Sequence, residues 1–96
     1  MKVCEEFYIN GEWVKPINDL KTLEVINPAT EEVFGRIALG DADDVNVAVN
    51  AASEAFQSFG YSTVDERVSL LEKILEIYQS KYDEIAETIS LEMGAP

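Results

Sequence analysis

The only thiol in this sequence, Cys4, is the first residue to consider as a covalent nucleophile. A cysteine attacks as the thiolate, so it needs a neighbouring base or positive charge. The sequence contains no histidine, and the acids Glu5 and Glu6 beside Cys4 disfavour a further anion if they lie close in space. The lack of histidine also excludes histidine-based triads and most zinc sites. We therefore interpret Cys4 as incidental to any chemistry.

Carboxylates are the second kind of reactive group, and their spacing argues against a site. The stretch 41–44, Asp-Ala-Asp-Asp, is similar to the start of a calcium loop, but such a loop needs glycine at its sixth position and glutamate at its twelfth. Asn46 and Ala52 stand there instead, which favours a helix cap. Adjacent acids such as Asp83-Glu84 point about 100° apart on a helix and do not converge on one substrate.

Phosphate-binding loops are also missing. The five glycines are isolated, and nothing matches the spacing of a dinucleotide-binding or P-loop motif; they are Gly11, Gly35, Gly40, Gly60 and Gly94. We therefore expect this protein to bind no dinucleotide by itself and to carry no catalytic or cofactor-binding residue.

The charge balance excludes further classes of function. Nineteen acids against seven bases give a net charge of −12, which opposes binding to nucleic acids or anionic membranes. No apolar run approaches the roughly 18 residues of a membrane span, and Glu5 and Glu6 interrupt any signal core at the start. We expect an acidic, cytoplasmic protein.

Residues 1–40 predict two short antiparallel β-hairpins. Asn10-Gly11 separates Phe7–Ile9 from Trp13-Val14, and this dipeptide between β-formers is typical of a two-residue hairpin turn. A second pair, residues 23–27 and 32–39, is joined through a turn that begins at Asn27-Pro28.

Residues 41–96 predict three helices. Asp41 is a good N-cap for the first, and Thr63 with Glu66 has capping-box spacing at the start of the second. The phase of the apolar pattern slips near Ser80–Tyr82, so we expect a break there. Gly94 follows the last periodic residue, where a helix closes with φ > 0, and Pro96 prevents its continuation. The fold class is therefore α+β.

The order of these segments resembles the opening of an NAD(P)-dependent aldehyde dehydrogenase. The resemblance runs from Phe7 to Pro96 and rests on "FYINGEWV", "LEVINPATEE", "DADDVNVAV" and "LEMGAP" in the order and spacing of the family. It implies that residues 1–96 are the N-terminal segment of a longer enzyme, the leading part of its α/β cofactor-binding domain. Most of that domain and the whole catalytic domain would then lie beyond this sequence.

The resemblance also implies a chemistry and one site. The family oxidises aldehydes with NAD or NADP through a cysteine thioester, and Cys4 does not match its catalytic cysteine. Many members bind a monovalent cation, Na+ or K+, and the matching residues here are Val25, Ile26 and Glu92. Backbone carbonyls and a carboxylate are suitable hard ligands for such an ion. The open alternative for Glu92 is a solvent-facing residue at a helix end.

Two expectations about partners follow. As part of a longer enzyme, the segment would pack against the remainder of the parent chain and, when separate, would expose apolar residues that favour self-association; these include some of Val45, Val49, Phe56, Leu71 and Ile74. The alternative is a stand-alone acidic protein-interaction module that derives from this segment.

Overall fold

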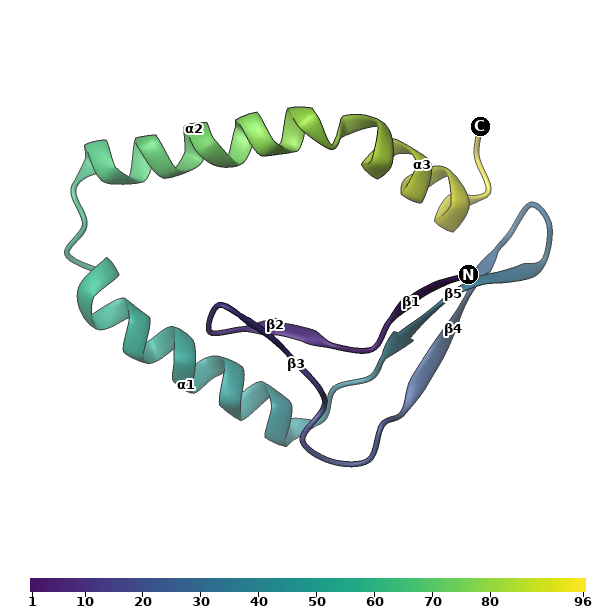
Figure 1. Ribbon diagram of the computed structural model, residues 1–96, viewed down its shortest axis with the longest axis horizontal. Coiled ribbons are helices and arrows are strands. Elements are labelled where there is room, and N and C mark those ends of the chain that lie inside the picture. Colours follow the sequence, from purple (N-terminus) through teal and green to yellow (C-terminus); the bar gives the residue numbers. More distant parts are fainter.

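The computed structural model describes residues 1–96, in which five short strands precede three helices (Figure 1). The strands are β1 (Lys2–Cys4), β2 (Phe7–Ile9), β3 (Glu12–Val14), β4 (Thr22–Asn27) and β5 (Glu32–Ala38). The helices are α1 (Ala42–Phe59), α2 (Val64–Ser80) and α3 (Tyr82–Met93). This architecture confirms the α+β class, with the strands in residues 1–40 and the helices after them.

The first predicted hairpin is confirmed. Strands β2 and β3 pair antiparallel, and the two turn residues both have positive φ, 54° at Asn10 and 79° at Gly11. That combination is typical of a type I′ turn, whose twist matches the twist of the flanking strands. The rings of Tyr8 and Trp13 lie opposite each other with their centroids 5.1 Å apart.

The second predicted hairpin is confirmed as a pair, but it belongs to a larger sheet. Strands β4 and β5 pair antiparallel, and β1 joins the other edge of β5 in parallel, giving the order β1-β5-β4. The prediction of two separate hairpins was therefore incomplete. Strand β1 has only three residues and no alternating pattern, and its partner lies more than thirty residues away, so no local signal reveals it.

Contacts on either side of β1 support its parallel pairing with β5. Gly35 lies opposite Lys2, where a Cβ on Gly35 would come within 3.0 Å of the Lys2 carbonyl oxygen. Arg36 donates to Glu5 from both Nε and Nη2 at 2.8 Å. Lys2 Nζ donates to Thr88 of α3 at 3.2 Å. These contacts join the start of the protein to β5 and to the last helix.

The helix boundaries agree closely with the sequence. Asp41 caps α1 and accepts from the backbone N–H groups of Asp43 and Asp44. Thr63 caps α2 and accepts from Glu66 N at 3.1 Å. The predicted break falls at Lys81, which separates α2 from α3 and has φ −107° and ψ 11°.

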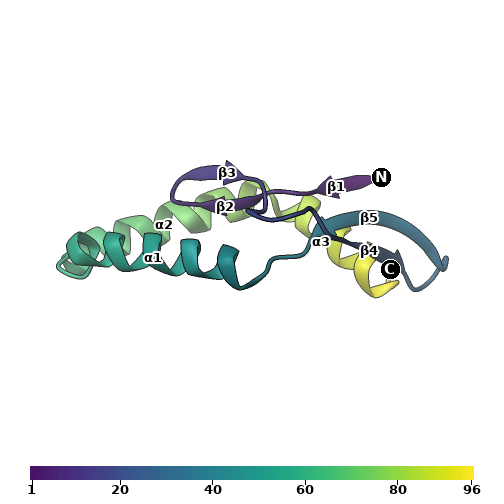
Figure 2. The ribbon, with the colours of Figure 1, turned by 90° about the horizontal axis from the view of Figure 1, so that it is seen from below.

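These elements form an open, flat ring with almost no core. The radius of gyration is 17.0 Å, against about 12.5 Å for a compact domain of this length. Its extents of 48 × 35 × 16 Å and the edge-on view in Figure 2 show how thin it is. Only three of the 96 residues are buried. The accessible surface is 7,899 Å², roughly 2,400 Å² more than the value of about 5,500 Å² expected for this mass.

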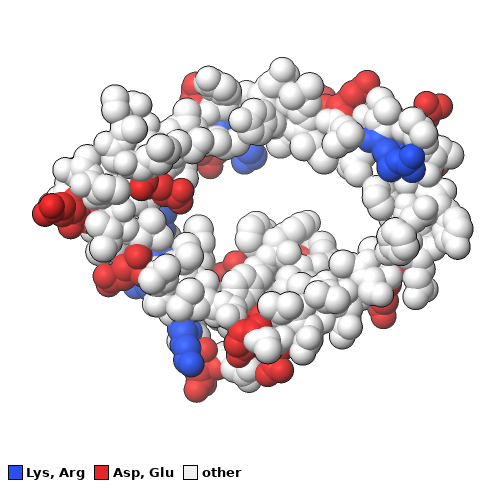
Figure 3. Space-filling view, turned by 180° about the vertical axis from the view of Figure 1, so that it is seen from behind, with Lys and Arg blue, Asp and Glu red and all other residues white.

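The apolar faces of the helices are exposed, as predicted. Exposed fractions reach 69% at Phe56 and 64% at Leu71, and Val45, Val49 and Ile74 are all above half. In Figure 3 the acidic side chains lie mainly around the outer rim, and most atoms bordering the central opening are uncharged. No helix has both the length and the apolar character needed to cross a membrane.

Candidate functional site

The end of α3 meets the turn that follows β4. The three residues predicted as cation ligands belong to these two elements, Val25 and Ile26 to β4 and Glu92 to α3. Gly94 closes α3 with φ 70°, and its N–H donates to Ser90 O at 2.8 Å. A Cβ on Gly94 would lie 2.8 Å from Ala29 N and 3.3 Å from Pro28 Cβ. Only glycine permits both this backbone conformation and this close approach of the helix end to the turn.

The turn itself is held by its own side chains. Asn27 Oδ1 accepts from Ala29 N at 2.9 Å, and Asn27 O accepts from Glu31 N at 2.8 Å. Glu31 takes a positive φ of 60° to complete the reversal. An asparagine side chain that mimics a backbone turn explains why Asn27-Pro28 can begin the connection between β4 and β5.

The structure places Val25 and Ile26 on β4 beside a β-bulge. Val25 pairs with Gly35 and Ile26 with Val33, so Phe34 on β5 is the extra residue without a partner on β4. A bulge interrupts the regular ladder of hydrogen bonds and redirects the strand. Strand β4 packs against α3, and Glu92 lies exposed in the last turn of that helix.

An open hollow of about 440 Å³ lies between the turn and the C-terminal end of α3. Its wall contains none of the three predicted ligands; it is formed by Asn27, Ala29, Glu87, Ser90, Leu91, Gly94, Ala95 and Pro96. Glu87 brings a carboxylate that the sequence analysis missed, although its position one helical turn before Leu91 puts both on one face. The structure thus brings the two segments together, and the cation site itself stays a prediction.

The acidic stretch at the start of α1 is a structural cluster. Asp44 is only 6% exposed and accepts from Ile17 N at 3.0 Å through Oδ1 and from Asp41 N at 3.0 Å through Oδ2. The side-chain amide of Asn18 donates to Asp41 at 2.7 Å and to Asp43 at 2.8 Å. These bonds hold the loop after β3 against the helix, in agreement with the predicted cap.

The hydrogen bond from Asn18 is the main reason that the pKa of Asp41 lies below its ordinary value of 3.8, because it favours the charged form. The backbone N–H groups of Asp44 and Asp43 act in the same direction. Sequence reasoning identified Asp41 as the cap but missed the burial of Asp44, since its burial depends on the loop at Ile17.

Cys4 is exposed on β1, opposite Ile37 of β5. Nowhere in the protein do three or more histidine, cysteine, aspartate or glutamate side chains form a group that could hold a metal ion.

The sequence profile of the aldehyde dehydrogenase family matches residues 13–96. This chain belongs to the aldehyde dehydrogenase family. A similar protein is the 3-succinoylsemialdehyde-pyridine dehydrogenase of a Pseudomonas species, which is 47% identical over 96 residues, covering 100% of this chain and 20% of the relative.

A solved structure extends the likeness to three dimensions. The crystal structure of an aldehyde dehydrogenase from Bartonella henselae matches with a TM-score of 0.95 at 46% identity, over 100% of this chain and 20% of that one. The chain thus spans about one fifth of the length of the aldehyde dehydrogenases that it matches. Because the likeness covers all 96 residues, the open ring is a shape that a segment adopts inside a much longer family member.

Proposed function

We propose that this chain is the N-terminal scaffold of a cytoplasmic enzyme that oxidises an aldehyde to a carboxylic acid with NAD+ or NADP+ through a cysteine thioester. The observation that carries the proposal is membership of the aldehyde dehydrogenase family with relatives about five times as long. The 96-residue chain by itself is inactive, because it has no histidine and no glycine-rich phosphate loop, and the carboxylates of Glu5 and Glu6 beside Cys4 disfavour its thiolate.

The exposed faces of the helices support a scaffold role. The surplus surface of roughly 2,400 Å² exceeds the roughly 800 Å² that each partner contributes to a standard interface. Such a surplus is comparable to a domain core cut in two, and residues 97 onward of a family member would cover it. The partner of this chain is therefore the remainder of an aldehyde dehydrogenase, on which α1 and α2 pack as the leading part of the cofactor-binding domain.

A monovalent cation, Na+ or K+, is the further ligand that we propose for the assembled enzyme. Carbonyl oxygens of Val25 and Ile26 with the Glu92 carboxylate form a donor set of hard oxygens, which suits such an ion. The packing of α3 on β4 supports this assignment, since it brings both segments to one junction. When bound, the ion would neutralise Glu92 at the C-terminal end of α3, where the helix dipole disfavours a negative charge.

The test is a chimera. The matched N-terminal fifth of the Pseudomonas dehydrogenase is replaced by this chain, and formation of the reduced nicotinamide is followed with the aldehyde in that enzyme's name. We expect the chimera to be active and the same enzyme without its N-terminal segment to be inactive. Leu71→Asp, on the exposed apolar face, should abolish the activity, whereas Glu72→Asp, at the next position, should leave it unchanged.

The alternative function, a stand-alone acidic interaction module, predicts the opposite activity for the chimera. It requires an inactive chimera together with a 96-residue chain that stays a monodisperse monomer at every concentration. Calorimetric titration of the 96 residues with NAD+ and with NADP+ adds a separate check. Micromolar binding of either dinucleotide would contradict the inactivity that we propose for these residues by themselves.

A further inference from the structure

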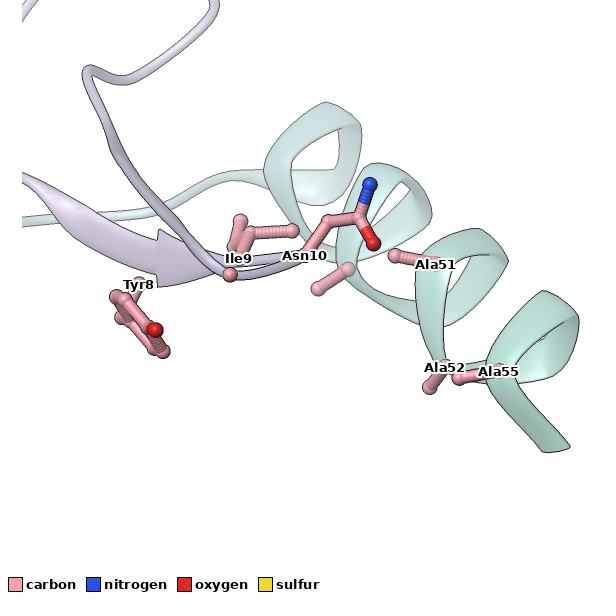
Figure 4. A pocket seen from close by; sticks show the side chains of 8 residues that line it. Tyr8, Ile9, Asn10, Ala51, Ala52 and Ala55 are labelled. Atoms are coloured by element: carbon pink, nitrogen blue, oxygen red, sulfur yellow. The ribbon is translucent and has the colours of Figure 1, made fainter. Parts of the chain in front are cut away.

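The tip of the β2–β3 hairpin carries the one Asn-Gly pair of the protein, Asn10-Gly11. Both residues are exposed, and neither the Asn10 side-chain amide nor the Gly11 N–H is engaged in an internal hydrogen bond. A Cβ added to Gly11 would meet nothing within 4 Å. Figure 4 shows the Asn10 side chain at this tip, beside a hollow whose other wall is formed by alanines of α1.

We propose that Asn10 is a site of spontaneous deamidation whose rate is set by opening of the β2–β3 hairpin. The Gly11 nitrogen attacks Asn10 Cγ and loses its proton to solvent, Asn10 Nδ2 takes up a proton from solvent, and the bond between Cγ and Nδ2 breaks so that ammonia leaves. The resulting five-membered succinimide is opened by water at either carbonyl, which gives aspartate or isoaspartate at position 10. The lack of a side chain on Gly11 leaves the attacking nitrogen unhindered.

Hairpin opening controls the rate because the closed turn fixes the backbone. With φ of 54° and 79° at its two residues, the closed type I′ turn keeps the backbone of Asn10-Gly11 in one conformation. Ring closure requires rotation of this backbone, which opening of the hairpin permits. Each strand has only three residues, and the two strands pair with no other strand. Isolated two-stranded hairpins are marginally stable. The tilted ring pair of Tyr8 and Trp13, with centroids 5.1 Å apart and an interplanar angle of 56°, therefore helps to keep it closed, together with the contact of β2 with α1.

The two products should affect the hairpin differently. Asp-Gly is accepted in the same type I′ turn, so aspartate at position 10 preserves the pairing of β2 with β3. Isoaspartate adds a methylene to the backbone, and a two-residue turn cannot absorb it. The isoaspartate form should therefore separate Tyr8 from Trp13. Trp13 is the only tryptophan of the protein, so its fluorescence reports on this turn directly.

The experiment incubates the 96-residue protein in neutral buffer and measures deamidation at each asparagine by peptide mass mapping. Asn46 and Asn50 are internal controls, because they lie within α1 and are followed by Val47 and Ala51. We expect Asn10 to react faster than either, and isoaspartate formation to change the Trp13 fluorescence.

Variants then test whether opening of the β2–β3 hairpin controls the deamidation rate. Trp13→Ala removes the ring pair and should raise the rate at Asn10 relative to Asn50 by about two- to tenfold, the effect expected from loss of one aromatic pair. Tyr8→Ala, which removes the same pair from the other side, should do the same, and Tyr8→Phe should not. Because general unfolding would accelerate all asparagines, the ratio of the two rates is the readout.

Two results would overturn the proposal. Deamidation at Asn10 no faster than at Asn46 and Asn50 would show that this turn is not a reactive site. An unchanged ratio of the Asn10 and Asn50 rates in both Trp13→Ala and Tyr8→Ala would show that hairpin opening does not control the reaction. Neither result bears on the scaffold role, which the chimera tests separately.

Discussion

Replacement of Gly94 by alanine tests the packing of α3 on the β4–β5 turn, which supports the proposed cation site. Gly94 has φ 70°, and its missing Cβ would lie 2.8 Å from the backbone nitrogen of Ala29. Gly94→Ala therefore imposes a left-handed conformation on alanine and a clash with a backbone atom. Gly11→Ala is a matched control, because φ is 79° there but nothing lies within 4 Å.

The expected losses of unfolding free energy differ between Gly94→Ala and Gly11→Ala because only Gly94 has a backbone atom close to the added Cβ. The left-handed conformation costs a residue with a Cβ about 1–2 kcal/mol. Overpacking against groups that cannot move adds about 1–3 kcal/mol. We therefore expect Gly11→Ala to destabilise the protein by about 1 kcal/mol, after allowance for the stiffer unfolded state. Gly94→Ala should destabilise it by about 2–4 kcal/mol.

Urea unfolding followed by far-ultraviolet circular dichroism measures both values at one protein concentration. Limited proteolysis adds a local readout, since Gly94→Ala should make α3 easier to cleave whereas Gly11→Ala should not. Equal losses for the two variants would mean that the end of α3 does not press on Ala29. The close packing of α3 on the turn would then be wrong, and the proposed cation site would lose the junction that supports it.

Three further predictions concern the helices and the exposed surface. Thr63→Ala should lower the free energy of unfolding by about 1 kcal/mol through loss of the cap on α2, and Thr63→Ser should not; an unchanged urea midpoint for the alanine variant would reject the cap. The pKa of Asp41 is lowered in the folded state, so its stabilising contribution is complete above its unfolded value of 3.8 and is lost as pH falls through the lower folded pKa. The unfolding free energy should fall in that acidic range less steeply for Asp41→Asn, which keeps a good N-cap but does not titrate; identical pH profiles would contradict this. The exposed apolar faces should make the protein self-associate as concentration rises, and Leu71→Glu should reduce that association in light scattering; a monomer at all concentrations would refute it.

Short-range signals predicted much of this fold. Asn10-Gly11 indicated a hairpin because the turn depends on two residues that tolerate positive φ. Asp41 and Thr63 indicated helix starts because each side chain bonds to N–H groups only two or three positions further on. Gly94 indicated a helix end for the same reason, since the left-handed closure is a property of one residue.

Contacts between distant residues were beyond such reasoning. The parallel pairing of β1 with β5 depends on Gly35 lying opposite Lys2, and no pattern within residues 2–4 indicates it. The capping box is a local feature, yet the sequence indicated it at the wrong helix. The sequence indicated reciprocal bonding for Thr63 and Glu66, yet the reciprocal box forms between Asp41 and Asp44, and only the bond to Thr63 Oγ1 is present at α2.

The sequence by itself indicated the resemblance to the family through the order and spacing of its motifs. It also predicted the β2–β3 hairpin, the β4–β5 pair and the three helices, because turns, caps and periodicity act within a few neighbouring residues. The tertiary structure decided that Asp44 is buried against Ile17, that the end of α3 touches Ala29, and that Glu87 faces the hollow there. It also decided that the ring stays open with its apolar faces exposed. The physical reason is that those outcomes depend on which distant surfaces meet, and hydrophobic attraction has no direction that a local pattern could encode.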